Sequence, residues 1–335
     1  MRIATLNCLN FTLPGRVAYA QVAPLTDAEY AARVEWLAAM LRRLDADLVL
    51  LQEIFHERAL AAAVARVGDE RTFSSAAPLA TDDNDKPRLG LAWRAPWQPT
   101  IETIRAFPPG LGVPLPDLPP HEAFSRPILC ARVAIEDRDG RRSPLVVFNV
   151  HLKSRRPILA GGETDEDASA RARGRLRALV ARGAEAAALR SLVVASLSSG
   201  AAVVVGGDFN DGIAAETTML VGDPVRPADA GVAPPESLVD VLQACDGPAP
   251  WRTAPAPTHI DGGAAERIDH LLVSRHFDAR AAGADEVRGR VLLVETLGDH
   301  LLERRRGAGE DGPDPARIAS DHAAVCVTLD VGPAR

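Results

Sequence analysis

Carboxylate, amide and imidazole side chains stand at the ends of several short apolar runs. Asn7 follows residues 3–6, Gln52 and Glu53 follow residues 48–51, Asn149 and His151 end the run that starts at residue 145, Asp208 and Asn210 follow residues 202–205, Asp269 opens the run up to residue 273, and Asp321 and His322 precede residues 323–331. Runs of this length, rich in β-branched residues or leucine, are typical of buried strands. We therefore interpret these polar side chains as strand-end groups that could meet in one site.

Such a set of side chains could hold a hard cation and activate water. The oxygen donors come without any thiolate, and they are Glu53, Asp208, Asp321, Asn7 and Asn210. This donor set suits Mg²⁺, Mn²⁺ or Ca²⁺ better than zinc. Asp269 and His322 could form a carboxylate–imidazole pair that favours the protonated ring. A divalent ion, an imidazolium and a carboxylate base together match the hydrolysis of a phosphate ester.

The strand directions constrain the architecture. If the polar groups converge on one edge of the core, four strands end there, whereas the strands that begin at Asp269 and after His322 start there. The last two strands must then run opposite to the others. This arrangement excludes a purely parallel doubly wound sheet and predicts a mixed or antiparallel α/β sandwich.

Three helical regions are predicted. Thr26 and Glu29 form a capping-box pattern, and apolar residues follow it at helical spacing up to residue 44. A second helix is expected from His56 to Val67, closed by Gly68. Residues 169–198 indicate a third, which Gly183 could interrupt. Its basic residues are interpreted as a solvated face, with phosphate binding as the alternative, and they are Arg171, Arg173, Arg175, Arg177 and Arg182.

The composition is that of an ordinary soluble protein. The chain has 335 residues, 38 Lys+Arg against 45 Asp+Glu, a formal net charge of −7 and 47% hydrophobic residues. No apolar run approaches the ~20 residues that span a bilayer, and the first residues lack a secretory signal, so a cytoplasmic location is expected. The four cysteines form no CxxC pair, which excludes a zinc ribbon. The acidic balance argues against non-specific coating of nucleic acid.

Six motifs resemble those of the endonuclease/exonuclease/phosphatase superfamily, which has the fold of pancreatic deoxyribonuclease and the abasic-site endonucleases. They are Ala4-Thr5-Leu6-Asn7, Leu51-Gln52-Glu53, Asn149-Val150-His151-Leu152-Lys153-Ser154, Gly207-Asp208-Phe209-Asn210, Arg267-Ile268-Asp269-His270-Leu271-Leu272-Val273-Ser274 and Ser320-Asp321-His322. Each is weak alone, but six in the family's order, each at a strand end, are a strong signal. The resemblance implies a four-layer α/β/β/α sandwich with two mixed, largely antiparallel sheets, and we expect residues 1–335 to form one domain.

The resemblance also implies a metal site. Glu53 resembles the main metal ligand, supported by Asn7 and Asp321. The expected cofactor is Mg²⁺, with Mn²⁺ as an alternative, as one or two ions. Arg126 resembles an arginine that contacts the substrate phosphate.

Catalytic roles follow from the same resemblance. Asp208 resembles the residue that orients or deprotonates the attacking water, with Asn210 positioning that water or a phosphate oxygen. His322 resembles the imidazole at the scissile phosphate, oriented by Asp269. His151 would bind the phosphate or assist the leaving group. Whether Asp208 or His322 is the base stays open at this point.

Several residues depart from the family's pattern or have uncertain roles. Tyr19 and Tyr30, the only tyrosines, lie outside the motifs, which disfavours the abasic-endonuclease type with its active-site tyrosine. His270 is an additional imidazole of unassigned role, and His259 is interpreted as a loop histidine, with a place at the border of the cleft as the alternative. Asp299 and His300 form a second Asp-His pair within the charged segment 295–319, but no strand follows it, so Asp321 and His322 are preferred.

The predicted function is that of a metal-dependent phosphoesterase, and the favoured type is a phosphodiesterase or nuclease that hydrolyses P–O bonds by in-line attack of water. The alternatives are a small-molecule phosphatase, a phospholipid or inositol phosphate phosphoesterase, and a catalytically silent binding module on the same fold. Basic residues that could hold a nucleic-acid backbone are Arg126, Lys153, Arg155 and Arg156. The expected partner is a phosphate-ester substrate, with nucleic acid among the candidates, and no obligatory protein partner is evident.

Overall fold

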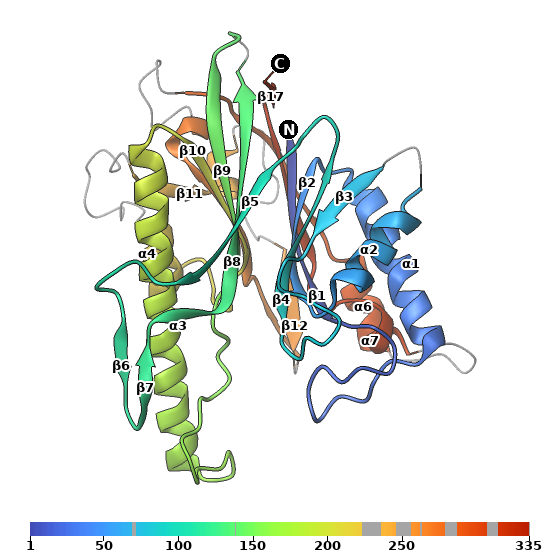
Figure 1. Cartoon of the computed structure of the whole chain (residues 1–335), viewed down its shortest axis with the longest axis vertical. Coiled ribbons are helices and arrows are strands. Elements are labelled where there is room, and N and C mark those ends of the chain that lie inside the picture. Colours follow the sequence, from blue (N-terminus) through green and yellow to red (C-terminus); the bar gives the residue numbers. More distant parts are fainter. Residues whose placement is uncertain are drawn as a thin grey trace.

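Two large β-sheets face each other at the centre of the computed structural model, and helices cover their outer faces (Figure 1). The structure describes residues 1–68, 72–137, 139–222, 236–245, 256–261, 263–278, 287–306 and 314–334. The predicted four-layer α/β/β/α sandwich is confirmed.

The first sheet contains the strands from both ends of the chain. In spatial order it consists of β15 (Val291–Leu297), β16 (Ala324–Leu329), β1 (Arg2–Phe11), β2 (Leu48–Ile54), β4 (Arg88–Arg94) and β3 (Phe73–Ala76). Strand β1 runs parallel to β2 and antiparallel to β16. The prediction that the last strand runs opposite to the first is therefore confirmed.

The second sheet contains the central strands of the chain. In spatial order it consists of β11 (Leu238–Asp240), β14 (Asp269–Ser274), β10 (Ala202–Asp208), β9 (Arg142–His151), β8 (Ala123–Glu136) and β17 (Gly332–Pro333), with β5 (Thr100–Ala106) also on β8. Strand β10 runs parallel to β9 and antiparallel to β14. Two small hairpins add β6 (Val113–Leu115) with β7 (Leu118–His121), and β12 (His259–Asp261) with β13 (Ala264–Glu266).

The helices form the two outer layers. The first sheet is covered by α1 (Asp27–Leu44), α2 (Glu57–Arg66), α6 (Asp299–Arg306) and α7 (Pro315–Ile318), and the second by α3 (Ala168–Ser198) and α4 (Glu216–Gly222) (Figure 1). Short turns α5 (Val241–Ala244) and η4 (Arg275–Phe277) complete the elements. Thr26 and Glu29 form the predicted capping box of α1. No described helix has the length and apolar character needed to cross a membrane.

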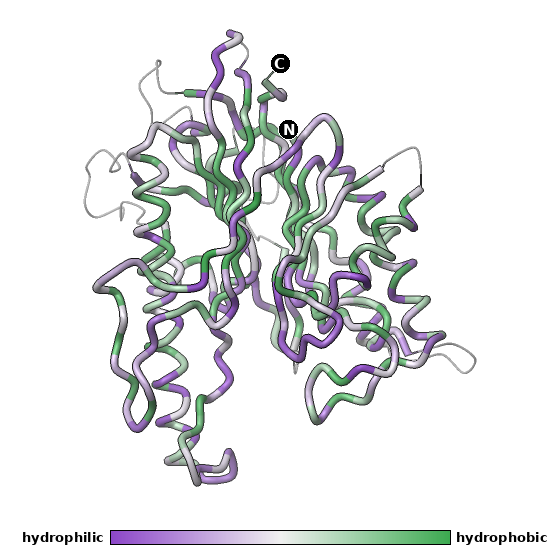
Figure 2. The backbone as a smooth tube through the Cα atoms, in the orientation of Figure 1, coloured by the Kyte–Doolittle hydropathy of each residue, from purple (hydrophilic) through white to green (hydrophobic). Residues whose placement is uncertain are grey.

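Three apolar cores hold the four layers together. Ile3 and Leu50 of the first sheet pack with Val147 and Val204 of the second in the central core. A second core joins the first sheet to α1 and α2, and a third joins the second sheet to α3. Apolar residues are accordingly concentrated in the strands, whereas the connecting segments are more polar (Figure 2). Both faces of each sheet are thus buried, which explains the short, nearly continuous apolar runs in the sequence.

Helix α3 corrects two predictions. It is continuous through Gly183, and its arginines do not form a purely solvated face. Arg177 is 1% exposed and binds Glu163, and Arg182 is 4% exposed and binds Asp211. Each of these buried guanidinium groups pairs with a carboxylate, and both carboxylates lie in loops outside α3, so helical periodicity could not reveal them.

A buried polar network joins the two sheets below the strand ends. Gln52 of β2 donates a hydrogen bond to the side-chain oxygen of Asn149 in β9 at 2.8 Å and to Thr5 at 3.1 Å. The Asn149 amide nitrogen donates to the carbonyl oxygens of Leu51 and Gly90. All three side chains are at most 1% exposed. The network therefore fixes the register of one sheet against the other.

We expect Asn149→Leu to lower the free energy of unfolding by about 3 kcal/mol. The substitution leaves the Gln52 amide and two carbonyl oxygens buried without this partner, and each such loss costs ~1–3 kcal/mol. Urea denaturation measures the change. The double variant with Gln52→Leu should cost less than the sum of the single variants, because the two side chains share one bond; strict additivity would contradict the network.

Candidate functional site

The strand-end residues of both sheets meet at one edge of the sandwich. Asn7 at β1 donates through Nδ2 to Asp208 Oδ2 of the second sheet at 3.0 Å and to Glu53 Oε1 of β2 at 3.3 Å. Within the second sheet, Asp208 lies opposite His151 on one side and opposite Asp269 on the other. Residues from distant parts of the sequence are therefore brought into one cluster.

Asp208 is the centre of this cluster. Its carboxylate is 2% exposed, and Oδ1 accepts the backbone N–H of Asn210 at 2.7 Å. Oδ2 lies 3.3 Å from Nε2 of His151 and 4.0 Å from Nε2 of His322. Burial raises the pKa of Asp208 above its usual value. A carboxylate with a raised pKa is a better proton acceptor, as general-base chemistry requires.

The backbone before Asp208 requires glycine. Gly207 has φ +150°, and a Cβ atom added there would lie 1.9 Å from the carbonyl oxygen of Val150 in the neighbouring strand. The close approach of β9 and β10 brings His151 and Asp208 into contact. Any side chain at position 207 would therefore collide with β9, which explains the glycine of the Gly207-Asp208 motif.

His322 forms the predicted pair with Asp269. Its Nδ1 lies 2.8 Å from Asp269 Oδ2, and Asp269 is fully buried. Although burial opposes a charge on the ring, the carboxylate of Asp269, with Asp208 and Asp321 nearby, raises the pKa of His322 to about 10. The ring is thus a cation at neutral pH. This favours Asp208 over His322 as the proton acceptor.

Glu53 lies at the end of β2 in an unusual backbone conformation, with φ +60°. Its Oε2 accepts the backbone N–H of Asn10 at 2.8 Å. Asn7 turns its nitrogen toward Glu53 and Asp208, while its oxygen accepts the N–H of Leu9 at 3.0 Å. In this orientation Asn7 holds the two carboxylates and presents no oxygen between them.

The donor set of the site suits a divalent cation. Two buried carboxylate oxygens, Asp269 Oδ1 and Asp321 Oδ1, have no hydrogen-bond partner. Although burial disfavours its charge, His259, His322 and Arg304 hold the pKa of Asp321 below its usual value, so it is ionised. Unpartnered carboxylate oxygens are the donors that Mg²⁺ prefers.

Strand β1 bulges next to Glu53 at two left-handed residues, between its pairings at Asn7 and Phe11. Leu9 and Asn10 have φ values of 48° and 51°, a conformation that costs energy for residues other than glycine. Arg33 of α1, 4% exposed, binds the carbonyl oxygens of Cys8 and Leu9. An outer-layer helix thus holds the bulge that aims the Asn10 N–H at Glu53.

Arg126 lies at this edge together with a residue that the sequence did not indicate. Its Nη1 donates to the carbonyl oxygen of Leu152 at 3.2 Å, and its buried Nε has no partner. Tyr19 hydrogen-bonds with Arg126, and its pKa is raised by burial and by the charge of Glu53. Arg156 lies over the Tyr19 ring at 5.9 Å. Tyr19 belongs to the segment between β1 and α1, where no motif marks it.

His151 and Lys153 lie on the continuation of β9. Burial, together with the charges of Arg126 and His322, keeps the pKa of His151 well below its usual value, so the ring is neutral. Lys153 donates to the carbonyl oxygens of Ser154 and Arg156, and burial lowers its pKa to about 8. Its ammonium is thus already bonded within its own loop.

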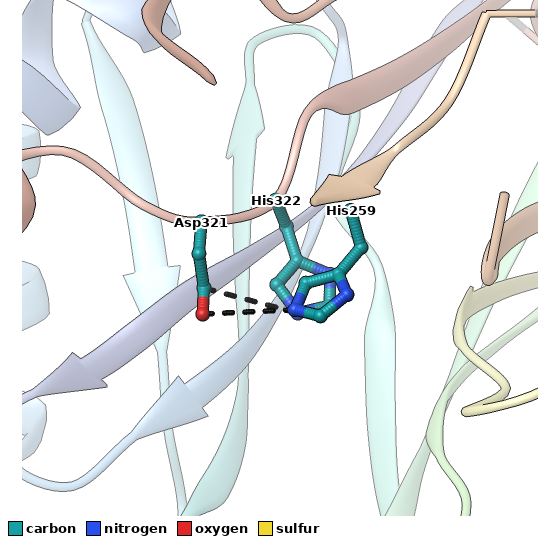
Figure 3. Close-up of side chains that lie close together, drawn as sticks. All are labelled: His259, Asp321 and His322. Atoms are coloured by element: carbon teal, nitrogen blue, oxygen red, sulfur yellow. Dashed lines mark ion pairs between the residues drawn. The ribbon is translucent and has the colours of Figure 1, made fainter. Parts of the chain in front are cut away.

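Two further histidines contact the site residue His322. The ring of His259 lies 4.6 Å from that of His322, so the interpretation of His259 as a loop histidine is wrong (Figure 3). His300, in α6, hydrogen-bonds through Nε2 to the carbonyl oxygen of His322 at 2.9 Å. His300 therefore supports the Asp321-His322 segment, whereas Asp299 pairs with Arg43 of α1. Both contacts join segments that are distant in sequence, so the spacing of residues in the sequence could not predict them.

Other polar residues have structural partners. His270 is buried and bonds through Nε2 to the carbonyl oxygen of Asp211 at 2.9 Å. Arg155 binds Asp211 and Glu266, so it is not a free basic group at the site. Of the charged segment 295–319, residues 307–313 lie outside the described part of the chain.

The comparisons with known proteins agree with the fold described above. The catalytic domain of *Xenopus laevis* APE2 is similar in structure, with a TM-score of 0.57 and 14% identity over 99% of this chain and 93% of that one. An endonuclease/exonuclease/phosphatase from *Bacteroides vulgatus* has a TM-score of 0.54 and 14% identity over 99% and 98% of the two chains. The human Nocturnin catalytic domain, solved with a bound sulfate anion, has a TM-score of 0.51 and 16% identity over 99% and 94%.

These likenesses establish the fold. Because all three identities are below 25%, they show nothing about activity. No curated protein sequence matches the chain. The sequence profile of the Endonuclease/Exonuclease/phosphatase family, however, matches residues 4–322 and so spans all six motifs. The chain belongs to the endonuclease/exonuclease/phosphatase family.

Proposed function

We propose that the protein is a divalent-metal-dependent phosphodiesterase of nuclease type, which hydrolyses P–O bonds by in-line attack of water. The observation that carries the proposal is the buried Asp208 carboxylate, whose Oδ2 lies between a neutral His151 and a protonated His322. A proton acceptor and a fixed cation at this separation suit attack on a phosphate group.

Each residue of the cluster has a distinct part in the proposed reaction. Asp208 accepts the proton of the attacking water, and the contact with His151 keeps its carboxylate oriented. Asn210 orients the water or a phosphate oxygen. The His322 ring, held by Asp269, stabilises the negative charge that develops on the phosphoryl oxygens. Arg126, whose buried Nε is unpartnered, binds the substrate phosphate.

Glu53 and Asp321 supply the oxygen ligands of the proposed metal site, and Asn7 and the Asn10 N–H hold Glu53 in place. Mg²⁺, or Mn²⁺ in its stead, would neutralise phosphoryl charge and help to orient the substrate there. The unpartnered Asp321 Oδ1 supports a cation at this position.

A nucleic-acid-type phosphodiester is the substrate class that we favour. Arg126 and Arg156 lie beside Tyr19 and offer phosphate contacts next to one aromatic ring. Non-specific single-strand binders stack successive bases on several aromatic rings. The single ring of Tyr19 would accommodate only one unstacked base. Plasmid DNA, single-stranded DNA, RNA, inositol phosphates and nucleotides, each assayed with Mg²⁺ and with EDTA, test this choice directly.

We expect the protein to hydrolyse bis(p-nitrophenyl) phosphate with Mg²⁺ or Mn²⁺, and we expect this activity to disappear in EDTA. The Glu53→Gln variant should need a higher metal concentration for the same activity. Removing one charged oxygen ligand should raise the half-saturating metal concentration by at least tenfold, as ligand charge sets affinity for hard cations. Glu136→Gln, at the far end of β8, is the matched control and should keep the wild-type metal curve.

Absence of metal-dependent turnover on every substrate of the panel, with wild type equal to Asp208→Ala, would identify a silent binding module instead.

A further inference from the structure

Three nitrogen and oxygen donors, of which only Asp321 belongs to the proposed Mg²⁺ ligands, lie together where two segments cross. His259 pairs with His322 through an antiparallel bridge, and the backbone N–H of Ala323 donates to the carbonyl oxygen of Thr258. One donor atom from each of His259, Asp321 and His322 lies within 4.8 Å of the other two (Figure 3). The backbone therefore places these side chains next to one another without help from a bound ligand.

The donor atoms face one another. His259 Nε2 lies 3.8 Å from Asp321 Oδ2, and His322 Nε2 lies 3.9 Å from Asp321 Oδ1. Asp321 Oδ1 has no hydrogen-bond partner. Two ligands of one tetrahedral zinc ion lie about 3.3 Å apart. Small side-chain adjustments would thus bring all three donors to bonding distance, and the exposed fractions of 22% for His259 and 27% for Asp321 leave access for an ion.

The chemistry of this cluster differs from that of the proposed Mg²⁺ ligands. Two imidazoles and one carboxylate favour Zn²⁺ and similar transition metals, whereas Mg²⁺ favours oxygen donors. The opposite nitrogen of the His322 ring is bonded to Asp269 at 2.8 Å. A carboxylate behind a ligating histidine fixes the ring and strengthens the metal bond. The supporting group of a zinc site is therefore already present.

We propose that His259, Asp321 and His322 form a site for Zn²⁺ or a similar transition metal. Binding there displaces the proton from Nε2 of His322, occupies that nitrogen, and takes up one carboxylate of the proposed Mg²⁺ site. On the basis of the proposed function, the transition metal is then an inhibitor that competes with Mg²⁺ and blocks the ring at the phosphate. The binding itself does not depend on any catalytic activity.

Binding is tested on the full chain after removal of metals with EDTA. Calorimetric titration with Zn²⁺ should show one site in the wild type and at least ~10²-fold weaker binding in His259→Gln, since loss of a supporting residue alone costs 10–100-fold. His276→Gln, beyond the opposite end of β14, is the matched control and should bind as the wild type does. Equal Zn²⁺ affinity in His259→Gln and wild type would overturn the site.

A cysteine variant gives a direct spectroscopic readout. Co²⁺ bound to His259→Cys should show a new thiolate-to-metal charge-transfer band that wild type lacks, because the four native cysteines are buried. His276→Cys should show no such band. Absence of the band in His259→Cys that folds and binds Co²⁺ would also overturn the assignment.

The two proposals fail in different ways. Zn²⁺ binding that requires His259, in a protein without hydrolytic activity, keeps the site and refutes the proposed function. Mg²⁺-dependent hydrolysis without Zn²⁺ binding at His259 keeps the function and refutes the site. With both in place, Zn²⁺ should inhibit hydrolysis, and a rise in Mg²⁺ should shift the inhibition curve to higher Zn²⁺ concentration.

Discussion

Replacement of His322 by alanine should reduce metal-dependent phosphodiester hydrolysis by about 10³-fold, as loss of one group that stabilises transition-state charge costs 10²–10³-fold. The ring is a buried cation 4.0 Å from Asp208. Its removal takes away the positive charge but leaves the proposed Glu53 metal ligand intact. Steady-state kinetics at saturating Mg²⁺ should show the loss in kcat, with a smaller change in KM. Near-wild-type turnover would refute the assignment of the site.

Asp269→Asn is the informative control for this result, because it keeps the ring and removes the carboxylate that charges it. In the wild type, His322 keeps its proton as pH rises until its pKa of about 10. Without Asp269, only Asp208 and Asp321 offset the effect of burial, and the proton should be lost at lower pH. The variant should therefore lose activity as pH rises through neutrality, whereas the wild type should not. Identical pH profiles would contradict the role of the pair.

Asp208→Asn should also lower kcat by about 10³-fold, within the 10²–10⁴-fold that general-base catalysis contributes. Asparagine keeps the shape of the side chain but cannot accept the proton of water. The assay is the same, with the protein at a concentration that detects the residual rate. A loss of less than tenfold would exclude Asp208 as the proton acceptor.

The same substitution should not weaken the fold in EDTA at pH 8. Burial raises the pKa of Asp208 in the folded state, so the unfolded chain releases this proton more readily, and ionisation above that pKa costs stability. Asparagine removes this cost. We expect an unchanged or higher melting temperature together with the loss of activity, a combination typical of functional residues. A melting temperature well below that of the wild type would show that Asp208 has a structural role.

The strands and the strand-end residues could be predicted from the sequence, because both sheets are buried on both faces and leave clear apolar runs. The opposed direction of β14 and β16 followed from where Asp269 and His322 stand relative to these runs. The roles of the individual residues remain proposals that the substitutions above test.

What the sequence did not reveal depends on long-range packing. Tyr19 lies in a segment without periodicity, and only the fold brings it to Arg126. His259 meets His322 through a bridge between segments 63 residues apart. Arg177 and Arg182 were misread because their acidic partners come from loops outside α3. Neither spacing nor composition encodes such pairings.

The Leu9–Asn10 bulge of β1 links the outer layer of the molecule to its interior. Its left-handed residues are held by Arg33, so the position of the Glu53 carboxylate depends on a side chain of helix α1. Sequence changes in α1 could then adjust ion affinity without altering any ligand. Relatives with identical ligand residues would, by this route, differ in the cation concentration at which they work.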